Sequence, residues 1–233
     1  ALLVAGEPGG QINGTREKIQ DTWGARVFDH HGMTEIGCVT FEHPDYPGAL
    51  YPLEEDFIVE VLEHGKSIPA PDGVPGELVL TNLGRTASPL LRYRTGDIVC
   101  REPIDREKAG GAFQASGVFK GGILGRADDM FFVKGNNVYP TTVESIIREF
   151  PEVAEYRMRV VESGGLNSLE VDIEADSELI NQVDPAGEPL EKRIEEALHD
   201  ALLFRVRVFP VGRGGLPRFE LKASRLVREK DKE

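Results

Sequence analysis

The stretch GRADDMFFVKGNNVYP at residues 125–140 decides the fold, because the pattern of the sequence changes within it. Phe131 to Val133 is a short β-rich run, and polar residues around a glycine form a loop behind it. The spacing of apolar residues then becomes helical, and Thr141-x-x-Glu144 predicts a capping box at the start of that helix. We therefore expect two domains, one over residues 1–125 and the other over residues 126–233.

The second domain is predicted to be a small α+β domain in which two helices cover one face of a sheet. Leu169, Val171 and Ile173 alternate with polar residues, which indicates a strand with one buried face. Apolar residues three and four positions apart indicate a helix between Leu190 and Leu202. The other predicted elements are a helix that Pro151 ends, and strands over Phe131–Val133, over Tyr156–Val161 and from Val206 onward.

The first domain is predicted to begin as α/β structure and to become β-rich. Between residues 55 and 100, runs of β-branched and aliphatic residues alternate with Gly and Pro, a pattern typical of successive strands. The Gly-rich stretch 105–125 is interpreted as a loop or hairpin that leads to the domain boundary. The elements predicted before residue 55 are a strand over residues 2–5, a helix over Thr15–Trp23 that Gly24 ends, and a strand over Ala25–Phe28.

The acidic composition argues against one large class of function. The formal charge is −13 over 233 residues, so we expect no general nucleic-acid binding. The charge is uneven, because residues 201–233 contain nine Lys and Arg against four Asp and Glu. This basic end is either a solvated tail or a surface that meets an anionic ligand such as ATP or CoA. No apolar run approaches the roughly 18 residues of a membrane span, so no membrane partner is expected.

Cysteine usage suits a cytoplasmic protein, because Cys38 and Cys100 lie far apart and form no disulfide framework. Cys38, His43 and Cys100 could contribute to a zinc site. The alternative is two ordinary buried thiols and a surface histidine, since no CxxC pair supports the metal. The chain starts inside a predicted strand, without methionine or a basic leader, so we expect a piece of a longer protein. Its oligomeric state stays open, a homodimer included.

The stretch HHGMTEIG at residues 30–37 follows a predicted strand, where sheets commonly present ligand contacts. Gly32 lets the backbone approach a ligand closely. The Thr34 hydroxyl can donate to a phosphate oxygen, and the Glu35 carboxylate is a hard oxygen ligand suited to Mg²⁺ between phosphates. The alternative is a structural turn that Thr34 and Glu35 cap.

The stretch LLRYRTGDI at residues 90–98 places Asp97 after a tight Thr-Gly turn at a strand edge. A carboxylate there can accept hydrogen bonds from both hydroxyls of a ribose, as acidic residues do in dinucleotide sites. The alternative is an ion pair between Asp97 and Arg92 or Arg94.

Taken in order, HHGMTEIG, RYRTGD, GRADD with VKGNNVYP, and LPRFELKASR at 216–225 resemble the later core motifs of adenylate-forming enzymes. The resemblance is closest to the phenylacetate–CoA ligase-like branch, and it runs from about Glu7 to Arg225. It implies the β-rich end of a large AMP-binding domain over residues 1–125, followed by a small mobile C-terminal domain. The implied reaction joins a small carboxylic acid to CoA through an acyl-adenylate, with ATP split into AMP and pyrophosphate.

The resemblance also implies a role for individual residues. The implied nucleotide contacts are His31, Gly32, Met33, Thr34, Asp97 and Arg126, with His31 where the family usually has an aromatic residue against adenine. Asp128 corresponds to the hinge of the small domain. The implied channel for the pantetheine arm of CoA is lined by Gly135, Asn136, Asn137 and Tyr139. Arg126 with an Asp could instead be a surface pair, and Asn-Asn an ordinary turn.

Lys222 resembles the catalytic lysine of the family, which bridges the substrate carboxylate and the α-phosphate. With Thr34 and with Glu35 as the Mg²⁺ ligand, it completes the implied catalytic set. The alternative is one more solvated basic residue of the tail.

The family's Ser/Thr/Gly-rich loop around the β- and γ-phosphates does not occur in residues 1–233. The rival hypothesis is therefore a non-catalytic regulatory module that binds AMP and CoA. Glu35 and Lys222 favour the ligase, because a binding module has little use for either.

Overall fold

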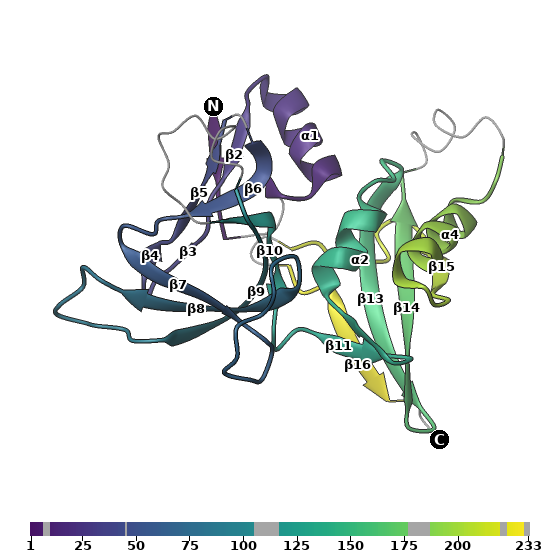
Figure 1. Cartoon of the computed structure of the whole chain (residues 1–233). Helices are drawn as coiled ribbons and strands as arrows, with labels where there is room; N and C mark the ends of the chain where they lie inside the picture. The colour runs from purple at the N-terminus through teal and green to yellow at the C-terminus, as the bar shows by residue number, and fades with distance from the viewer. Residues whose placement is uncertain (7–9, 45, 105–116, 177–186, 220–222, 231–233) are drawn as a thin grey trace. The chain divides into compact units, whose positions relative to one another are not determined.

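A computed structural model of the chain describes residues 1–6, 10–44, 46–104, 117–176, 187–219 and 223–230. The chain divides into two compact units, Ala1–Asp129 and Met130–Glu233 (Figure 1). The predicted boundary after residue 125 lies a few residues before this division. The reason is local: the Ala127 N–H donates to the Gly96 carbonyl at 2.7 Å, which ties the segment after residue 125 to the first unit.

The first unit is built around a six-stranded antiparallel sheet. The strands, in spatial order, are β5 (Thr40–His43), β6 (Tyr46–Pro52), β10 (Val118–Arg126), β9 (Tyr93–Glu102), β8 (Pro75–Asn82) and β7 (Phe57–Leu62). Leu50, Leu80 and Phe119 are fully buried within the apolar core of this unit. The predicted β-rich segment is therefore confirmed, while β5 and β6 had no counterpart among the predicted strands.

Where it is described, the Gly-rich segment before the boundary is the second strand of a hairpin, which is one of the two predicted alternatives. β10 pairs with β9 in an antiparallel hairpin, and its register shifts between Phe119 and Ile123. Gly121 and Gly122 lie in that interval with φ of 70° and 67°. Glycine at both positions accommodates the bulge, because residues with a side chain rarely adopt positive φ.

Several smaller elements precede the six-stranded sheet in the sequence of the first unit. β1 (Leu2–Val4) pairs in parallel with β2 (Val27–Asp29), and α1 (Asn13–Trp23) connects them. Gly24 ends α1 in the left-handed conformation, as predicted. β3 (Gly32–Met33) and β4 (Gly37–Cys38) then form a short antiparallel hairpin.

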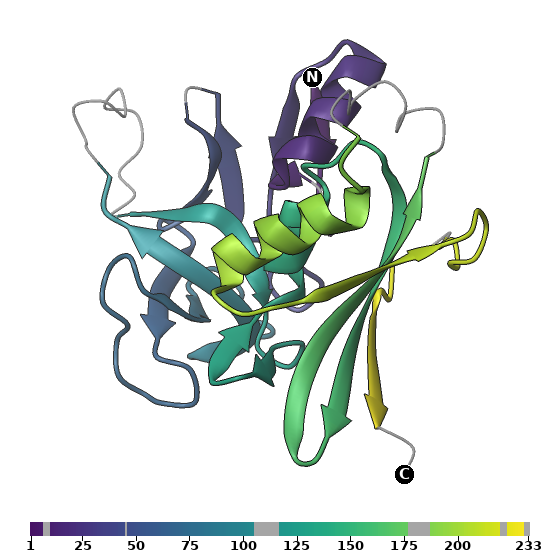
Figure 2. The ribbon, with the colours of Figure 1, turned by 90° about the vertical axis from the view of Figure 1, so that its right-hand side faces the viewer.

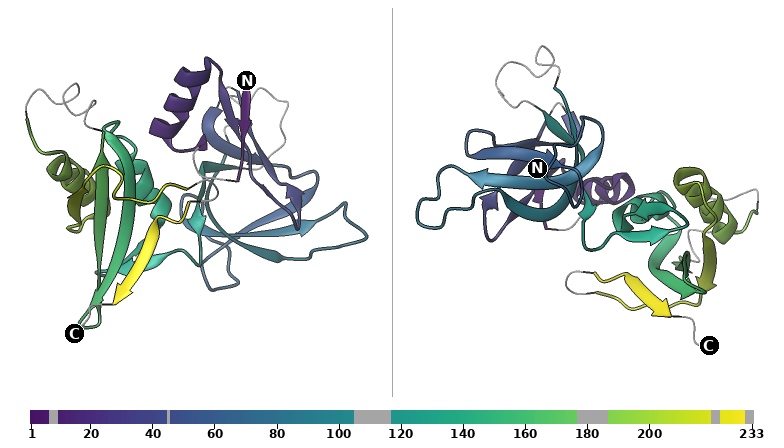
Figure 3. Two further views of the ribbon diagram at one scale, coloured as in Figure 1. Left: turned by 180° about the vertical axis from the view of Figure 1, so that it is seen from behind. Right: turned by 60° about the horizontal axis from the view of Figure 1, so that its bottom comes forward.

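The second unit contains a four-stranded sheet and two helices. Its strands, in spatial order, are β15 (Arg207–Val211), β14 (Leu166–Ala175), β13 (Val153–Ser163) and β16 (Leu226–Lys230). The remaining elements are the hairpin of β11 (Phe131–Val133) and β12 (Asn136–Val138), with helices α2 (Pro140–Ile147) and α4 (Leu190–Leu202). Both helices lie against one face of the sheet and share its apolar core (Figure 2; Figure 3). The predicted α+β arrangement is confirmed.

Three details of the second unit differ from the predictions. The residue before α2 is Tyr139, which makes no side-chain cap, and Pro140 occupies the first helical turn, so the capping box does not form. β14 is buried on both faces, because Glu170, Asp172 and Glu174 are buried as well as the apolar residues between them. β15 is followed by a further strand, since β16 runs parallel to β13 from Leu226 onward.

None of the described helices is both long and apolar enough to cross a membrane.

Candidate functional site

The first part of the site is the β3–β4 hairpin that carries HHGMTEIG. Its register pairs Gly32 with Cys38, and a side chain at Gly32 would come within 2.7 Å of the Gly37 carbonyl oxygen, so only glycine fits there. Ile36 is buried and anchors the turn in the core. Thr34 and Glu35 are exposed in the turn. The fold therefore presents a hydroxyl and a carboxylate at the tip of a fixed hairpin.

Asp97 is a buried carboxylate in β9, and its backbone is fixed from within the sheet. Its N–H donates to the Thr95 hydroxyl at 3.0 Å, and that hydroxyl donates to the Leu78 carbonyl at 2.9 Å. Burial alone would raise the pKa of Asp97. The hydrogen bond and charge of His31, and then those of Arg126, outweigh burial and hold the pKa below its ordinary value. Asp97 is therefore a carboxylate at neutral pH.

Arg126 reaches Asp97 across the β9–β10 pair. Its Nη1 donates to Asp97 Oδ1 at 2.9 Å and to the Thr95 carbonyl at 3.0 Å, while Nη2 lies 3.8 Å from Asp128 Oδ2. Burial lowers the pKa of Arg126, but the charge and hydrogen bond of Asp97 reverse this and raise it. The alternative pairing of Asp97 is wrong, because Arg92 pairs with Glu60 and Arg94 with Glu77.

His31 closes the other side of Asp97. Its Nε2 lies 3.0 Å from Asp97 Oδ2, and only 13% of the His31 side chain is exposed. Because a carboxylate only accepts, Nε2 is the donor in this bond. The sequence singles out His31, Asp97 and Arg126 separately. His31 and Asp97 are separated by 66 residues in the sequence, so no local signal could have revealed their contact.

Other predicted residues are placed apart from this cluster. The described contacts join neither Thr34 nor Glu35 to Asp97. Lys222 lies outside the described residues. Within the described part of the chain, no group of three or more His, Cys, Asp or Glu side chains could hold a metal. The residues considered for zinc have other neighbours: Cys38 Sγ lies 3.9 Å from His30 Nδ1, and His43 contacts the ring of Tyr51.

In the second unit, the predicted residues of the VKGNN loop form the turn and second strand of the β11–β12 hairpin. Lys134 and Gly135 occupy the turn with φ of 48° and 92°. The open space beside Gly135 leaves the turn accessible. Asn136 and Asn137 are exposed, whereas Tyr139 is partly buried before α2, and burial raises its pKa.

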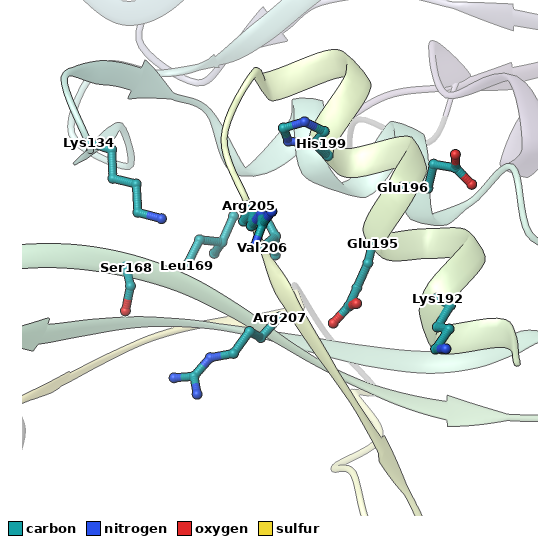
Figure 4. Close-up of a pocket in the computed structure, with 10 residues that line it drawn as sticks. All are labelled: Lys134, Ser168, Leu169, Lys192, Glu195, Glu196, His199, Arg205, Val206 and Arg207. Carbon is teal, nitrogen blue, oxygen red and sulfur yellow. The ribbon is translucent and has the colours of Figure 1, made fainter.

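An open pocket of about 700 Å³ lies beside this turn, and the sequence did not reveal it (Figure 4). Its lining comes from the hairpin turn, from β14, from one face of α4 and from the start of β15. The lining residues are Lys134, Ser168, Leu169, Lys192, Glu195, Glu196, His199, Arg205, Val206 and Arg207.

The pocket lining carries charges of both signs. Arg207 pairs with Glu170, and Glu195 accepts the Val208 N–H at 2.9 Å. Among the described residues, no ion pair involves Lys134, Lys192 or Arg205, and none involves Glu195 or Glu196, so the lining has three unpaired cations and two unpaired carboxylates. The basic excess after residue 201 is the signal that could have pointed here, because Arg205 and Arg207 belong to it.

Comparisons with known proteins identify chains that this one resembles. Residues 135–230 match the family model described as "AMP-binding enzyme C-terminal domain". A phenylacetate–coenzyme A ligase of Thermus thermophilus is 32% identical over 83% of this chain and 42% of its own length, and one of Pseudomonas putida is 32% identical over 70% and 36%. The chain thus spans less than half of the curated relatives it matches.

Among solved structures, a 2-hydroxyisobutyryl-CoA ligase in the postadenylation state superposes with a TM-score of 0.83 over 97% of this chain and 48% of its own. At 23% sequence identity, this likeness establishes the fold.

Proposed function

The chain belongs to the adenylate-forming enzyme superfamily, in its phenylacetate–CoA ligase-like branch, and on this premise we propose that it forms part of an AMP-forming acid–CoA ligase. In the first half-reaction a carboxylate oxygen bonds to the α-phosphorus of ATP and pyrophosphate leaves. In the second, the thiol sulfur of CoA bonds to the acyl carbon, loses its proton, and AMP leaves. The products are an acyl-CoA, AMP and pyrophosphate.

The observation that carries this proposal is the buried carboxylate of Asp97 between His31 and Arg126. An ionised acid in a rigid strand can accept both ribose hydroxyls, since a carboxylate offers about four lone-pair positions. Arg126 is 43% exposed at its side chain while it holds Asp97, so its guanidinium can also meet a ribose or phosphate oxygen. Met33, Gly32 and His31 supply the neighbouring hairpin surface for the base.

The exposed tip of the hairpin suits the phosphates. Thr34 can donate a hydrogen bond to a phosphate oxygen. Glu35 fits Mg²⁺, because that ion is usually held by one or two carboxylates together with phosphates and waters, and Glu35 is an exposed carboxylate. Mg²⁺ would supply charge neutralisation at the phosphates. Lys222 would place a cation between the substrate carboxylate and the α-phosphate, where charge builds up during adenylation.

We assign a different part of the second unit to each half-reaction, Lys222 to adenylation and the turn at Gly135 to CoA transfer. Lys222 belongs to the second unit and Asp97 to the first, so adenylation requires both. Asp128 lies in the turn just before the division between the units, and its side chain is 76% exposed, as a hinge residue requires freedom to move. The solved 2-hydroxyisobutyryl-CoA ligase structures are described as a postadenylation, an open and a thioesterification state, which supports a reaction in successive conformations.

CoA would meet the second unit. The β11–β12 turn at Gly135 is open enough for a narrow chain, and Asn136 and Asn137 offer polar contacts to the amides of the pantetheine arm. The adjoining pocket suits the phosphates of CoA, because Lys134, Lys192 and Arg205 gather there. The free thiols of Cys38 and Cys100 suit a cytoplasmic reaction.

The test is release of pyrophosphate by the full-length protein with ATP and a panel of carboxylic acids, including phenylacetate, benzoate, 2-hydroxy acids and short aliphatic acids. The ligase releases pyrophosphate only with its acid, and yields a thioester when CoA is added. Asp97→Asn should lower the rate at least about tenfold, because it removes the charge that organises the site. Binding of AMP and CoA without pyrophosphate release from any acid would instead support the regulatory module.

A further inference from the structure

The position of His31 is fixed more firmly than a stacking residue requires. Its N–H donates to the Thr40 hydroxyl at 2.9 Å, and its carbonyl accepts from the N–H groups of Val39 and Thr40 at 2.9 and 3.1 Å. Val39 and Thr40 are fully buried. Three backbone hydrogen bonds to buried neighbours therefore define where the imidazole can lie.

The imidazole is directed at one oxygen of Asp97. Asp97 Oδ2 accepts a hydrogen bond from His31 Nε2 at 3.0 Å, whereas Oδ1 accepts one from Arg126 Nη1 at 2.9 Å. One partner on each oxygen prevents rotation of the carboxylate about its Cβ–Cγ bond. Arg126 could not do this alone, because its Nη1 is shared with the Thr95 carbonyl and its Nη2 is turned toward Asp128.

We propose that His31 is a positioning residue for Asp97: the hydrogen bond from Nε2 to Oδ2 sets the orientation in which the carboxylate meets the ribose hydroxyls. The inference rests on the proposed function, because it takes Asp97 as the ribose contact. It assigns His31 a task that an aromatic hydrocarbon ring cannot perform, since such a ring has no N–H to donate.

Two substitutions separate this role from stacking against adenine. His31→Phe keeps a flat ring but removes the donor, which leaves a buried carboxylate oxygen without its partner. His31→Gln removes the ring but keeps an N–H of similar reach, so it can still donate to Asp97. Positioning predicts that Gln preserves nucleotide binding and Phe impairs it. Stacking predicts the reverse order.

The experiment is calorimetric titration of the full-length protein and its variants with AMP, 2′-deoxy-AMP and 3′-deoxy-AMP. We expect His31→Phe to weaken AMP binding about tenfold or more, and His31→Gln to stay within about threefold of the wild type. His64→Phe makes the same substitution at an exposed histidine of the β7–β8 connection and should bind as the wild type does. Thermal unfolding of each variant checks that it is folded.

The deoxy nucleotides test whether the effect passes through Asp97. In the wild type, loss of a ribose hydroxyl should weaken binding, and in His31→Phe this penalty should shrink because the carboxylate no longer meets the ribose correctly. An unchanged penalty, or His31→Gln weakened as much as His31→Phe, overturns the inference while the proposed function stands. Absence of AMP binding by the wild type overturns both.

Discussion

Gly96 shows how a single residue without a side chain organises the proposed nucleotide site. It has φ of 76°, and a Cβ built on it would lie 2.9 Å from Arg126 Nη2 and 3.3 Å from Arg126 Cζ. The guanidinium therefore occupies the space that any other residue would need. Gly96 lies within β9 and not in the tight turn that the sequence predicts, and the absence of a Cβ there leaves room for Arg126 to bind Asp97 across the sheet.

Gly96→Ala should destabilise the protein by about 2–4 kcal/mol, since it combines a strained backbone with displacement of Arg126 from a buried carboxylate. Gly73→Ala is the matched control, because Gly73 has φ of 78° and open space around its Cβ position. That variant should lose only about 1–2 kcal/mol from backbone strain. The measurement is chemical denaturation of both variants. Equal losses would show that the contact with Arg126 has no energetic weight.

At the scale of elements, the sequence predicts those whose signals are local. Phe131–Val133 is a strand with the predicted bounds, the stretch predicted as successive strands after residue 55 contains β7, β8 and β9, and Gly24 ends α1. The strand over Leu226–Lys230 was missed because its sequence, LVREK, resembles a charged tail and it pairs with distant β13. Likewise, Asp97 and Arg126 were predicted as site residues, but their contact depends on strand register. Pairing across a sheet is the information that local patterns lack.

β14 illustrates why alternation can mislead. Its polar positions are buried because arginines cover them: Arg157 and Arg159 bond to Asp172, and Arg218 bonds to Glu174 at 2.7 Å. Glu174 also accepts the N–H groups of Gly214 and Leu216 at 2.9 and 3.4 Å. Alternation in a sequence shows only which residues are apolar and which are polar. Where polar residues form buried ion pairs, a polar residue no longer indicates an exposed position.

Glu174 should make the stability of the second unit depend on acid. Its hydrogen bonds from Arg218, and then from Gly214, lower the pKa of Glu174 from 4.5 to about 2. Because the pKa of Glu174 is lower in the folded protein than in the unfolded chain, its ionised carboxylate stabilises the fold. This contribution to the free energy of unfolding is fully present above about pH 4.5 and is lost as the pH falls toward 2. Glu174→Gln should thus be less stable than the wild type at pH 7.

The difference between the wild type and Glu174→Gln in free energy of unfolding should shrink between pH 5 and pH 3, measured by denaturation followed by circular dichroism. Glu149→Gln changes an exposed glutamate of the same unit and serves as the control. A difference that is constant over this pH range would contradict the assigned role of Glu174.

Helix α4 leads to a separate prediction for CoA. Lys192 lies on its pocket face, and Arg205 follows its end. Lys192→Ala and Arg205→Ala should each weaken CoA binding about three- to tenfold, because each removes a charge-assisted phosphate contact, and should leave AMP binding unchanged. Lys18→Ala, at an exposed position of α1, is the control. With dephospho-CoA in place of CoA, at least one of the two substitutions should weaken binding less. If both variants weakened AMP binding as much as CoA binding, the pocket would not be a specific site for the phosphates of CoA.

At the scale of the whole molecule, the site residues divide between two units that each have their own core. Asp97, Arg126 and the hairpin around Glu35 belong to the first unit, and the turn at Gly135 and Lys222 belong to the second. The proposed reaction uses Lys222 in one half-reaction and the turn at Gly135 in the other. The two half-reactions should therefore respond differently to the same substitution.

Lys222→Ala should lower adenylation, read as acid-dependent pyrophosphate release, by about 10²–10³-fold, because it removes the cation that offsets charge at the α-phosphorus. Transfer to CoA from a supplied acyl-adenylate should fall less than about threefold, because in the proposed second half-reaction Lys222 has moved away and the turn at Gly135 takes its place. Lys66→Ala, an exposed lysine of the first unit, should leave both rates unchanged. Loss of both half-reactions to the same extent in a folded Lys222→Ala variant would contradict the division of roles, and with it the need for Lys222 and the turn at Gly135 to exchange places during turnover.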